Sequence, residues 1–243
     1  MTVKKVALIT GANKGIGFEV AKQLANLGYF VYIGSRDKAK GLEAVEELKA
    51  LGFTDVDTLE IDVTNTQSVE NAKEELQSKV PQLDVLVNNA GISGAMPQNA
   101  SIVSLDNVRM VYETNFFGVI QVTQHFLDLL KKSDEPRIVN VSSDLGSLTN
   151  HNNPNYPFYE VKLTAYCTSK TSLNAFTVML AYELKDTNFK VNSVNPGFTA
   201  TDLNGFAGVQ TTGQASKVIV KYAILDKNGP TGKFFSEDGE VAW

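Results

Sequence analysis

Two side chains capable of acid–base chemistry, Tyr166 and Lys170, stand four residues apart in the segment YCTSK. Residues at this spacing lie on one face of a helix. An ammonium group beside a phenol favours the phenolate, so we expect Lys170 to lower the pKa of Tyr166 from about 10 toward the working range. Such a phenol is suited to protonating a carbonyl oxygen as a hydride arrives. The pair alone is a weak signal, because many tyrosine and lysine residues stand four apart by chance.

Two further polar residues are candidates to support that chemistry. Ser143 follows an apolar run and is placed to hydrogen-bond a carbonyl group. Asn115 lies within a long stretch of helical periodicity, where asparagine is a poor choice, so we expect it to support a proton-relay water through a local distortion of the helix. An exposed asparagine would look the same in the sequence.

A glycine-rich turn, TGANKGIG, follows the first apolar run. Its spacing is G-x-x-x-G-x-G, and such glycines permit a tight turn that brings a pyrophosphate close to a helix N-terminus. An ordinary strand-to-helix turn is the alternative, but the position near the start of the chain favours nucleotide binding. The predicted cofactor contacts in this turn are Gly11, Asn13, Lys14, Gly15, Ile16 and Gly17.

The end of the second apolar run bears on the choice between the two nicotinamide cofactors. An acidic residue there grips the ribose of NAD, whereas Arg36 is suited to bind a 2′-phosphate through two hydrogen bonds. Lys14 offers a second positive charge. The alternative is a solvated surface pair in which Asp37 neutralises Arg36. We favour the first interpretation, which predicts a strong preference for NADPH.

Two more run ends provide candidate contacts to the adenosine half of the cofactor. Asp62, followed by Val63, is placed to accept a hydrogen bond from the adenine amino group, or else is a helix-start carboxylate with Thr64 or Asn65 as the cap. The small residues after the fourth run let the chain pass close to the adenine ribose, although turn chemistry explains them equally well. The predicted contacts there are Asn89, Ala90 and Gly91.

Short apolar runs alternate with longer amphipathic stretches along the whole chain. This alternation predicts an α/β fold, a single-domain Rossmann-like doubly wound parallel sheet of about seven strands with helices on both faces. Its cofactor half would span about 1–130 and its catalytic and substrate half about 131–243. Because ligands bind at the carboxyl ends of such strands, the polar run ends should meet in one crevice. The runs are Val3–Ile9, Tyr29–Gly34, Asp57–Ile61, Val85–Val87, Arg137–Val141, Lys190–Val194 and Gly232–Phe235, and the principal helical stretches are Ile16–Leu27, Asp37–Leu51, Ser104–Leu130 and Thr168–Lys185.

Composition excludes several classes of protein. The 243 residues carry a net charge of −5 with no basic stripe, which argues against nucleic-acid binding. One cysteine and two histidines make neither an internal disulfide nor a structural zinc site, and we expect no metal. No apolar run is long enough for a signal peptide or a membrane span. We therefore expect a soluble, cytoplasmic protein with no membrane partner.

Taken together, these motifs resemble the short-chain dehydrogenase/reductase family over almost the whole chain, in both order and approximate spacing. The resemblance implies that Asn115, Ser143, Tyr166 and Lys170 form the family's catalytic tetrad, and that Lys170 also binds the nicotinamide ribose. The segment after Pro196-Gly197 would position the nicotinamide amide, through Phe198, Thr199 and Thr201. The glycine loop, Arg36 and the C-terminal segment look most like the NADPH-dependent carbonyl reductase branch.

The resemblance implies reduction of a small ketone or aldehyde by NADPH, with Tyr166 protonating the oxygen and Ser143 holding it. Two alternatives stay open. One is a non-catalytic NADP-binding sensor or scaffold, although a sensor needs neither Tyr166 nor Lys170. The other is a reductase of carrier-bound 3-oxoacyl chains, which would call for a basic patch that the linear sequence does not show.

The chain departs from the family pattern between Ser143 and Tyr166, which are 23 residues apart. The extra material, roughly 149–161, would lie near the pocket mouth and near a helix surface that many relatives use to dimerise. A dimer or tetramer is therefore possible and a monomer is not excluded. A glycine-containing stretch, Thr199–Gly213, resembles the family's mobile substrate loop, and Leu203 and Phe206 are its candidate apolar substrate contacts.

Overall fold

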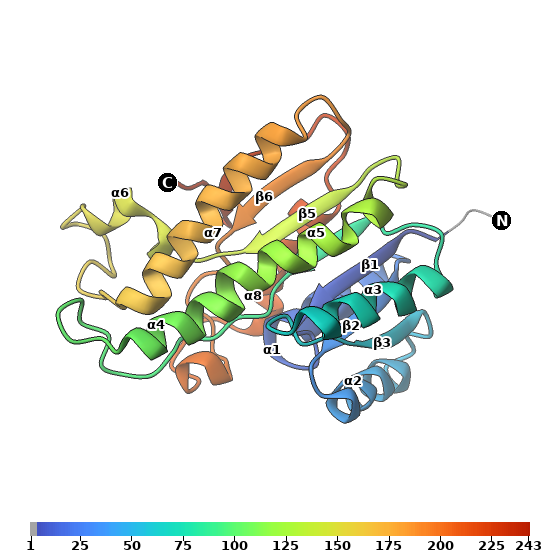
Figure 1. Cartoon of the computed structure of the whole chain (residues 1–243), viewed down its shortest axis with the longest axis horizontal. Coiled ribbons are helices and arrows are strands. Elements are labelled where there is room, and N and C mark those ends of the chain that lie inside the picture. The colour runs from blue at the N-terminus through green and yellow to red at the C-terminus, as the bar shows by residue number, and fades with distance from the viewer. Residues whose placement is uncertain (1–3) are drawn as a thin grey trace.

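The computed structural model describes residues 4–243, and within them one eight-stranded sheet runs through the molecule in the order β3-β2-β1-β4-β5-β6-β7-β8 (Figure 1). The first seven strands are parallel, and β8 is antiparallel to β7. The strands are β1 (Val6–Thr10), β2 (Phe30–Ser35), β3 (Val56–Glu60), β4 (Val85–Asn88), β5 (Arg137–Val141), β6 (Lys190–Val194), β7 (Phe234–Ser236) and β8 (Gly239–Glu240).

The predicted doubly wound α/β sheet is confirmed, with two differences in detail. The periodicity indicated seven strands and missed β8, because a two-residue strand is too short to show a pattern. The first run was predicted to begin at Val3, which lies outside the described residues, and β1 begins at Val6.

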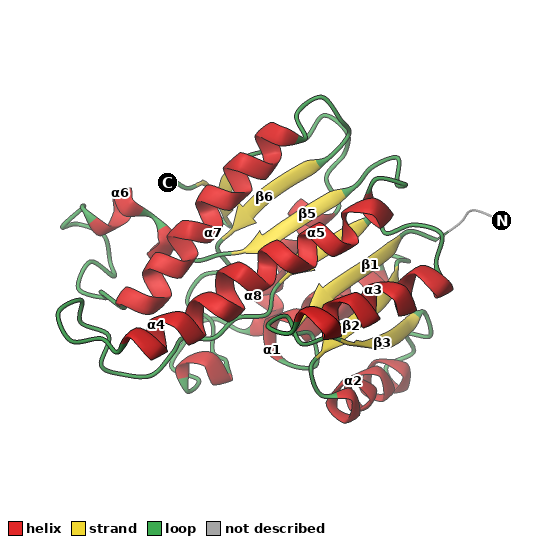
Figure 2. Ribbon diagram, viewed as in Figure 1, coloured by secondary structure: helices red, strands yellow, loops and turns green. Residues whose placement is uncertain are grey.

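Helices cover both faces of the sheet (Figure 2). Alternation along β1 explains why: Ala7 and Ile9 belong to one buried cluster, and Val6 and Leu8 to the other. The first cluster packs under α1 (Gly15–Asn26), α2 (Lys38–Ala50) and α8 (Thr212–Ala223), and the second under α3 (Thr66–Lys79), α5 (Gly118–Leu130) and α7 (Thr164–Glu183). The strands are thus buried on both sides, as their nearly continuous apolar runs predicted.

Two helical stretches differ from their predicted form, and both differences concern candidate site residues. The stretch Ser104–Leu130 is divided into α4 (Leu105–Tyr112), a π-helical turn (Glu113–Phe117) and α5. Asn115 lies in that turn, so the predicted local distortion of the helix is present. Helix α7 begins at Thr164, four residues earlier than Thr168, and therefore contains both Tyr166 and Lys170.

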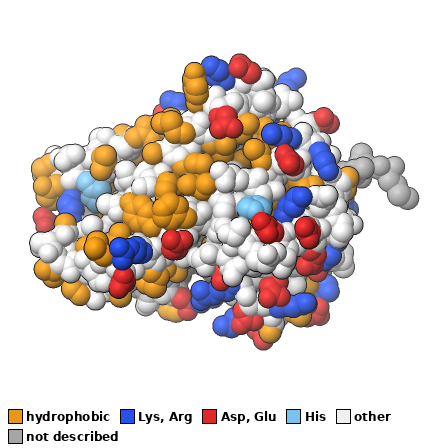
Figure 3. Space-filling model, in the orientation of Figure 1, with side chains coloured by type: hydrophobic (Ala, Val, Ile, Leu, Met, Phe, Trp, Pro, Cys, Tyr) orange, Lys and Arg blue, Asp and Glu red, His pale blue; other side chains and the backbone are white. Residues whose placement is uncertain are grey.

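The surface divides by character on the face drawn in Figure 3. Apolar side chains gather over α4, the π-helical turn and α7. The exposed apolar residues of these elements include Met110, Phe117, Met179 and Tyr182. Lys and Arg side chains alternate with Asp and Glu around α2 and α3 and form no stripe on this face. Across residues 4–243, the helices are too short or too polar to traverse a bilayer.

Candidate active site

The carboxyl ends of the central strands meet at one edge of the sheet, and the candidate residues gather there. Ser143 stands two residues after β5, and Tyr166 and Lys170 lie in the first two turns of α7. Ser143 lies close enough to the Tyr166 phenol to act on its pKa, so the two candidate groups are neighbours. Asn115 packs behind them in the π-helical turn. The tertiary structure therefore brings all four predicted catalytic residues together.

Tyr166 is held by a residue that the sequence analysis missed. Gln98 is buried, and its Oε1 accepts a hydrogen bond from the backbone N–H of Tyr166 at 3.1 Å. Its Nε2 donates to the carbonyl of Ser93 at 2.7 Å, and its own carbonyl accepts from the N–H of Thr164. Gln98 thus caps the start of α7 and orients Tyr166. No local sequence signal pointed to it, because the two segments are far apart along the chain.

Lys170 is buried beneath the site. Its Nζ donates to the carbonyl of Val141 at 2.8 Å, and the same atom lies 5.8 Å from the centre of the Tyr166 ring. Burial lowers the pKa of Lys170 from 10.5 to about 8, because the charged form loses its hydration. The backbone of Gly91 passes close to Lys170 and to Asn115, since a Cβ on Gly91 would stand 3.6 Å from Lys170 Nζ and 3.3 Å from Asn115 Oδ1.

The prediction that Lys170 lowers the pKa of Tyr166 is wrong for this structure. Burial raises the pKa of Tyr166 to about 12, while hydrogen bonding to Ser143 acts in the opposite direction. Lys170 is not among the groups that shift the phenol, because its ammonium is turned to the Val141 carbonyl and is itself desolvated. The phenol is consequently in its protonated form at neutral pH, which is the form that can donate a proton.

The side chain of Asn115 is fully engaged within the protein. Its Oδ1 accepts from the N–H of Ile92 at 2.9 Å, and its Nδ2 donates to the Ile92 carbonyl at 2.9 Å and to Ser169 Oγ at 3.1 Å. Asn115 therefore joins the segment after β4 to α7. Its predicted support of a relay water stays a prediction.

The buried ammonium of Lys170 predicts a pH-dependent stability. Each tenfold change in proton affinity is worth about 1.4 kcal/mol, so the lowered pKa corresponds to a penalty on the order of 3 kcal/mol when the folded chain keeps the proton. The penalty is full below pH 8 and fades between about 8 and 10.5, where the unfolded chain still binds a proton that the folded chain has released. We expect Lys170→Met to raise the free energy of unfolding at pH 7 by roughly 1–3 kcal/mol, and the gain to shrink by pH 10.

Urea unfolding of the two proteins at pH 7 and pH 10 measures this difference. Lys221→Met, which removes an exposed lysine on α8, is the control and should show little dependence on pH. An equal difference between wild type and Lys170→Met at both pH values would contradict the assignment of a buried, proton-releasing amine.

The glycine loop fits a pyrophosphate. Helix α1 begins at Gly15 after Lys14, which supplies no side-chain cap, so the helix leaves its first N–H groups available to a ligand. Gly15 has a φ of +64°, a conformation that favours glycine. A Cβ on Gly17 would stand 2.5 Å from Asn89 Nδ2, and that amide donates to the carbonyls of Thr10 and Gly11. Asn89 thus ties the end of β4 to the loop.

Comparison with known proteins agrees with this arrangement. Residues 5–210 match the family described as short chain dehydrogenase. The chain belongs to the short-chain dehydrogenase/reductase family. It is 32% identical to (+)-neomenthol dehydrogenase of Capsicum annuum over 96% of each protein, and 33% identical to salutaridine reductase of Papaver bracteatum over 97% of this chain and 95% of that one. Among solved structures it is similar to NADPH-bound carbonyl reductase from chicken fatty liver, with 26% identity, full coverage of both chains and a TM-score of 0.85. The chain is thus an oxidoreductase of a family that uses NAD(P).

The end of β2, predicted to lie at the adenosine end of the cofactor, presents an exposed arginine. Arg36 follows β2 directly, while the Asp37 carboxylate accepts from the N–H of Lys40 and caps α2. The surface pair between Arg36 and Asp37 that the sequence left open is not among the ion pairs of residues 4–243. The predicted second cation, Lys14, instead pairs with Asp202 at 3.1 Å, and both side chains are exposed.

At the end of β3, the contacts of Asp62 agree in part with its interpretation as a carboxylate at the start of a helix. Asp62 Oδ1 accepts from the N–H of Thr64 at 2.9 Å and from its hydroxyl at 2.8 Å, which forms a local turn. Asn65 caps α3 by accepting from the N–H of Ser68. Val63 beside it is buried. The contact between Asp62 and adenine stays a prediction.

The loop after β6 reaches back to the glycine loop. Gly197 has a φ of +80°, and the buried Thr199 donates to its carbonyl at 3.0 Å, so that hydroxyl is turned into its own loop. Pro196 accepts from the side chain of Gln210, which closes the loop. Thr201 packs toward Gly15, where a Cβ would stand 3.9 Å from its methyl group. Leu203 and Phe206, the predicted apolar contacts, are exposed nearby.

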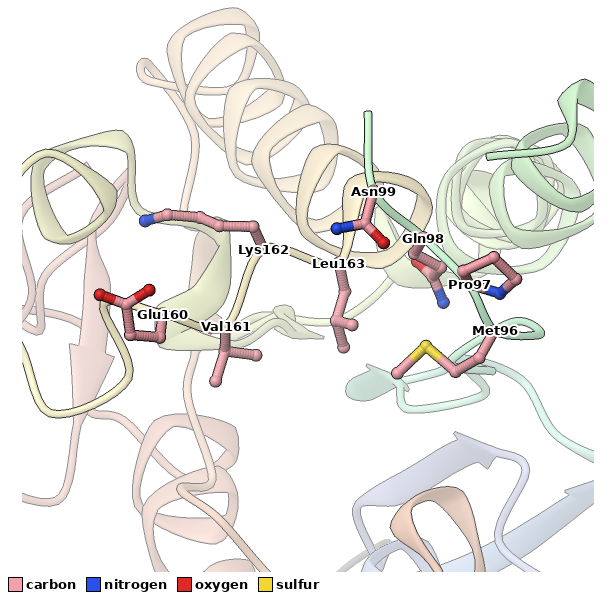
Figure 4. Close-up of a pocket in the computed structure, with 8 residues that line it drawn as sticks. All are labelled: Met96, Pro97, Gln98, Asn99, Glu160, Val161, Lys162 and Leu163. Carbon is pink, nitrogen blue, oxygen red and sulfur yellow. The ribbon is translucent and has the colours of Figure 1, made fainter. Parts of the chain in front are cut away.

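The extra segment is anchored rather than free. Helix α6 (Leu148–His151) opens it, and Thr149 donates to the carbonyl of Trp243 through both its N–H and its hydroxyl. Beside it a pocket of about 440 Å³ opens between residues 96–99 and 160–163 (Figure 4). Met96 and Leu163 present apolar side chains to it, and Glu160 lies at the opposite end from Met96. The segment therefore borders the start of α7, and its predicted place near the pocket mouth stays a prediction.

Proposed function

We propose that this short-chain dehydrogenase reduces a ketone or an aldehyde to an alcohol with NADPH as the cofactor. The observation that carries the proposal is the protonated Tyr166 phenol beside Ser143, with the buried Lys170 Nζ 5.8 Å from the centre of its ring. Proton donation by a positioned phenol is the step that a carbonyl reduction needs from a protein. The relatives named as reductases and dehydrogenases support the same chemistry.

The chain's own residues fit the cofactor along the sheet edge. The uncapped start of α1 would hold the pyrophosphate, and Arg36 would meet a 2′-phosphate. We propose that Lys170 binds the nicotinamide ribose and that the loop from Pro196 to Thr201 positions the nicotinamide. Bound NADPH supplies the hydride that the carbonyl carbon accepts.

The protein supplies the proton and the orientation. Ser143 Oγ would hold the carbonyl oxygen next to the Tyr166 hydroxyl, which donates its proton as negative charge develops. A pKa of about 12 keeps the phenol protonated before each turnover, so the proton donor is in place when the hydride arrives.

The two alternatives lose support for separate reasons. A sensor or scaffold would bind the cofactor without needing a phenol beside Ser143 at the strand ends. A reductase of carrier-bound chains would need a basic docking patch, and on the face drawn in Figure 3 the Lys and Arg side chains alternate with Asp and Glu. We also propose that the two halves of the chain, about 1–130 and 131–243, act together as one catalytic domain.

The test is NADPH oxidation by the purified protein with a panel of activated ketones and aldehydes, with NADH in parallel. We expect turnover with NADPH and at least tenfold less with NADH, because a charge-assisted contact to the 2′-phosphate is worth about 1.5–3 kcal/mol. Tight NADPH binding without turnover across the panel would favour the sensor. Activity confined to carrier-bound 3-oxoacyl substrates, and lost with added salt, would favour the third function.

A further inference from the structure

A carboxylate that the proposed mechanism does not use stands beside the candidate catalytic serine. Asp144 follows Ser143 directly and is partly exposed, and Ser143 Oγ donates to Asp144 Oδ1 at 3.3 Å. The same carboxylate acts electrostatically on the Tyr166 phenol and on the Cys167 thiol. Asp144 therefore stands in contact with Ser143, the residue proposed to hold the carbonyl oxygen.

This carboxylate has no cation against it. Asp144 takes part in none of the ion pairs found among residues 4–243. The neighbouring lysines are engaged elsewhere. Lys162 Nζ donates to the carbonyl of His151 at 3.0 Å and lies 4.3 Å from the centre of the Tyr159 ring, and Lys170 donates to Val141.

An aromatic wall adjoins the carboxylate on the side of the extra segment. The rings of Tyr156 and Phe158 meet edge to face at 5.7 Å, and Phe158 meets Phe198 in the same way at 5.8 Å. The Tyr156 hydroxyl is buried and faces Asp144, but it makes no hydrogen bond of normal geometry within the described residues. Burial, and then the facing Asp144, raise the pKa of this phenol above its usual range. The Tyr156 hydroxyl and the Asp144 carboxylate therefore lie close together at the end of this wall.

Such a site is unfavourable for the proposed reaction unless a positive charge enters with the substrate. Negative charge develops on the carbonyl oxygen beside Ser143 during reduction, and Asp144 repels it. Aromatic faces next to a carboxylate are, in turn, the surroundings that bind an alkylammonium group best. A cation on the substrate would pair with Asp144, contact the wall and offset the repulsion.

We propose that Asp144, with the wall of Tyr156, Phe158 and Phe198, selects carbonyl substrates that carry a protonated amine. The inference rests on the proposed carbonyl reduction and adds the substrate class to it. Asp144 is the residue that determines the preference, and the wall provides the contact surface for the alkyl groups around the nitrogen.

Three ketones of closely similar shape test the proposal at pH 7: β-dimethylaminopropiophenone, which is cationic, neutral γ-methylvalerophenone, and anionic β-benzoylpropionate. We expect wild type to reduce the amine with a kcat/KM at least tenfold above that of the neutral ketone, and the carboxylate at least tenfold below it. Asp144→Asn should bring the amine and the neutral ketone within about threefold of each other, with the neutral ketone unchanged or faster. Glu160→Gln is the control. It removes a carboxylate of the extra segment that is not part of the contact with Ser143, and it should retain the wild-type ratio.

Binding separates this inference from the proposed function. Calorimetric titration of the same ketones into NADP⁺-saturated protein should show the tenfold preference for the amine in wild type and its loss in Asp144→Asn. If no ketone is reduced but the binding preference appears, the reduction is wrong and the amine site stands. Equal binding of the amine and the neutral ketone by wild type, or a preference that survives Asp144→Asn, overturns the inference. If Asp144→Asn does not fold, the ratio of amine binding to neutral-ketone binding in wild type decides whether the inference stands.

Discussion

Replacing Tyr166 with phenylalanine is expected to lower kcat/KM for carbonyl reduction on the order of a thousandfold, while NADPH still binds. The substitution removes one hydroxyl and keeps the ring that packs at the start of α7. Ser143 and Lys170 stay in place, so substrate binding should persist, but no group replaces the proton donor. Steady-state NADPH oxidation measures the loss, and fluorescence titration of NADPH shows that the cofactor site is intact.

Tyr182→Phe is the matched control, because Tyr182 lies on the same helix with 69% of its surface exposed and faces away from the strand ends. Its activity should stay close to wild type. If Tyr166→Phe kept more than a tenth of the wild-type kcat/KM, the assignment of Tyr166 as the acid would be wrong.

The second large effect concerns the cofactor. Arg36→Asp should lower the ratio of kcat/KM for NADPH to that for NADH on the order of a hundredfold, because it removes a bidentate partner of the 2′-phosphate and places a negative charge there. Arg36 is exposed at the end of β2 and Asp37 is committed to capping α2, so the guanidinium is available to the phosphate. The ratio comes from parallel assays with each cofactor and one ketone.

Arg109→Asp provides the comparison, since this exposed arginine on α4 is paired with Asp106 and lies outside the cofactor contacts. It should leave the NADPH-to-NADH ratio as in wild type. An unchanged ratio in Arg36→Asp would instead assign the preference for NADPH to other groups. Lys14 would be the first of these to test, in a variant that lacks its partner Asp202.

Much of the fold could be predicted because the governing pattern is local. Strands buried on both faces must be apolar along their length, and β5 and β6 have the predicted bounds for that reason. Asparagine is unfavourable within a helix, and Asn115 therefore predicted a local distortion, which the structure contains as a π-helical turn. The two-residue β8 and the early start of α7 left no such pattern, because short elements are stabilised by their neighbours rather than by their own periodicity.

Some residues of the candidate site could likewise be predicted from the sequence, and others could not. Position at a strand end selected Ser143 and the glycine loop, because parallel topology brings those ends together. The four-residue spacing of Tyr166 and Lys170 on a helix, together with the family resemblance, selected that pair. Gln98 could not be found in this way, since it reaches Tyr166 across 68 residues of chain. The same holds for the pairing of Lys14 with Asp202.

The sequence by itself thus determined the sheet, its helical cover and which residues meet at its carboxyl edge, since periodicity and strand-end position are properties of the chain. Only the tertiary structure decided the protonation of those residues and the direction in which they point. Burial raises the pKa of Tyr166 and lowers that of Lys170, the reverse of what an isolated pair on a helix predicts. Desolvation depends on everything packed around a group, and the aromatic wall that faces Asp144 exists only after the extra segment folds onto the site.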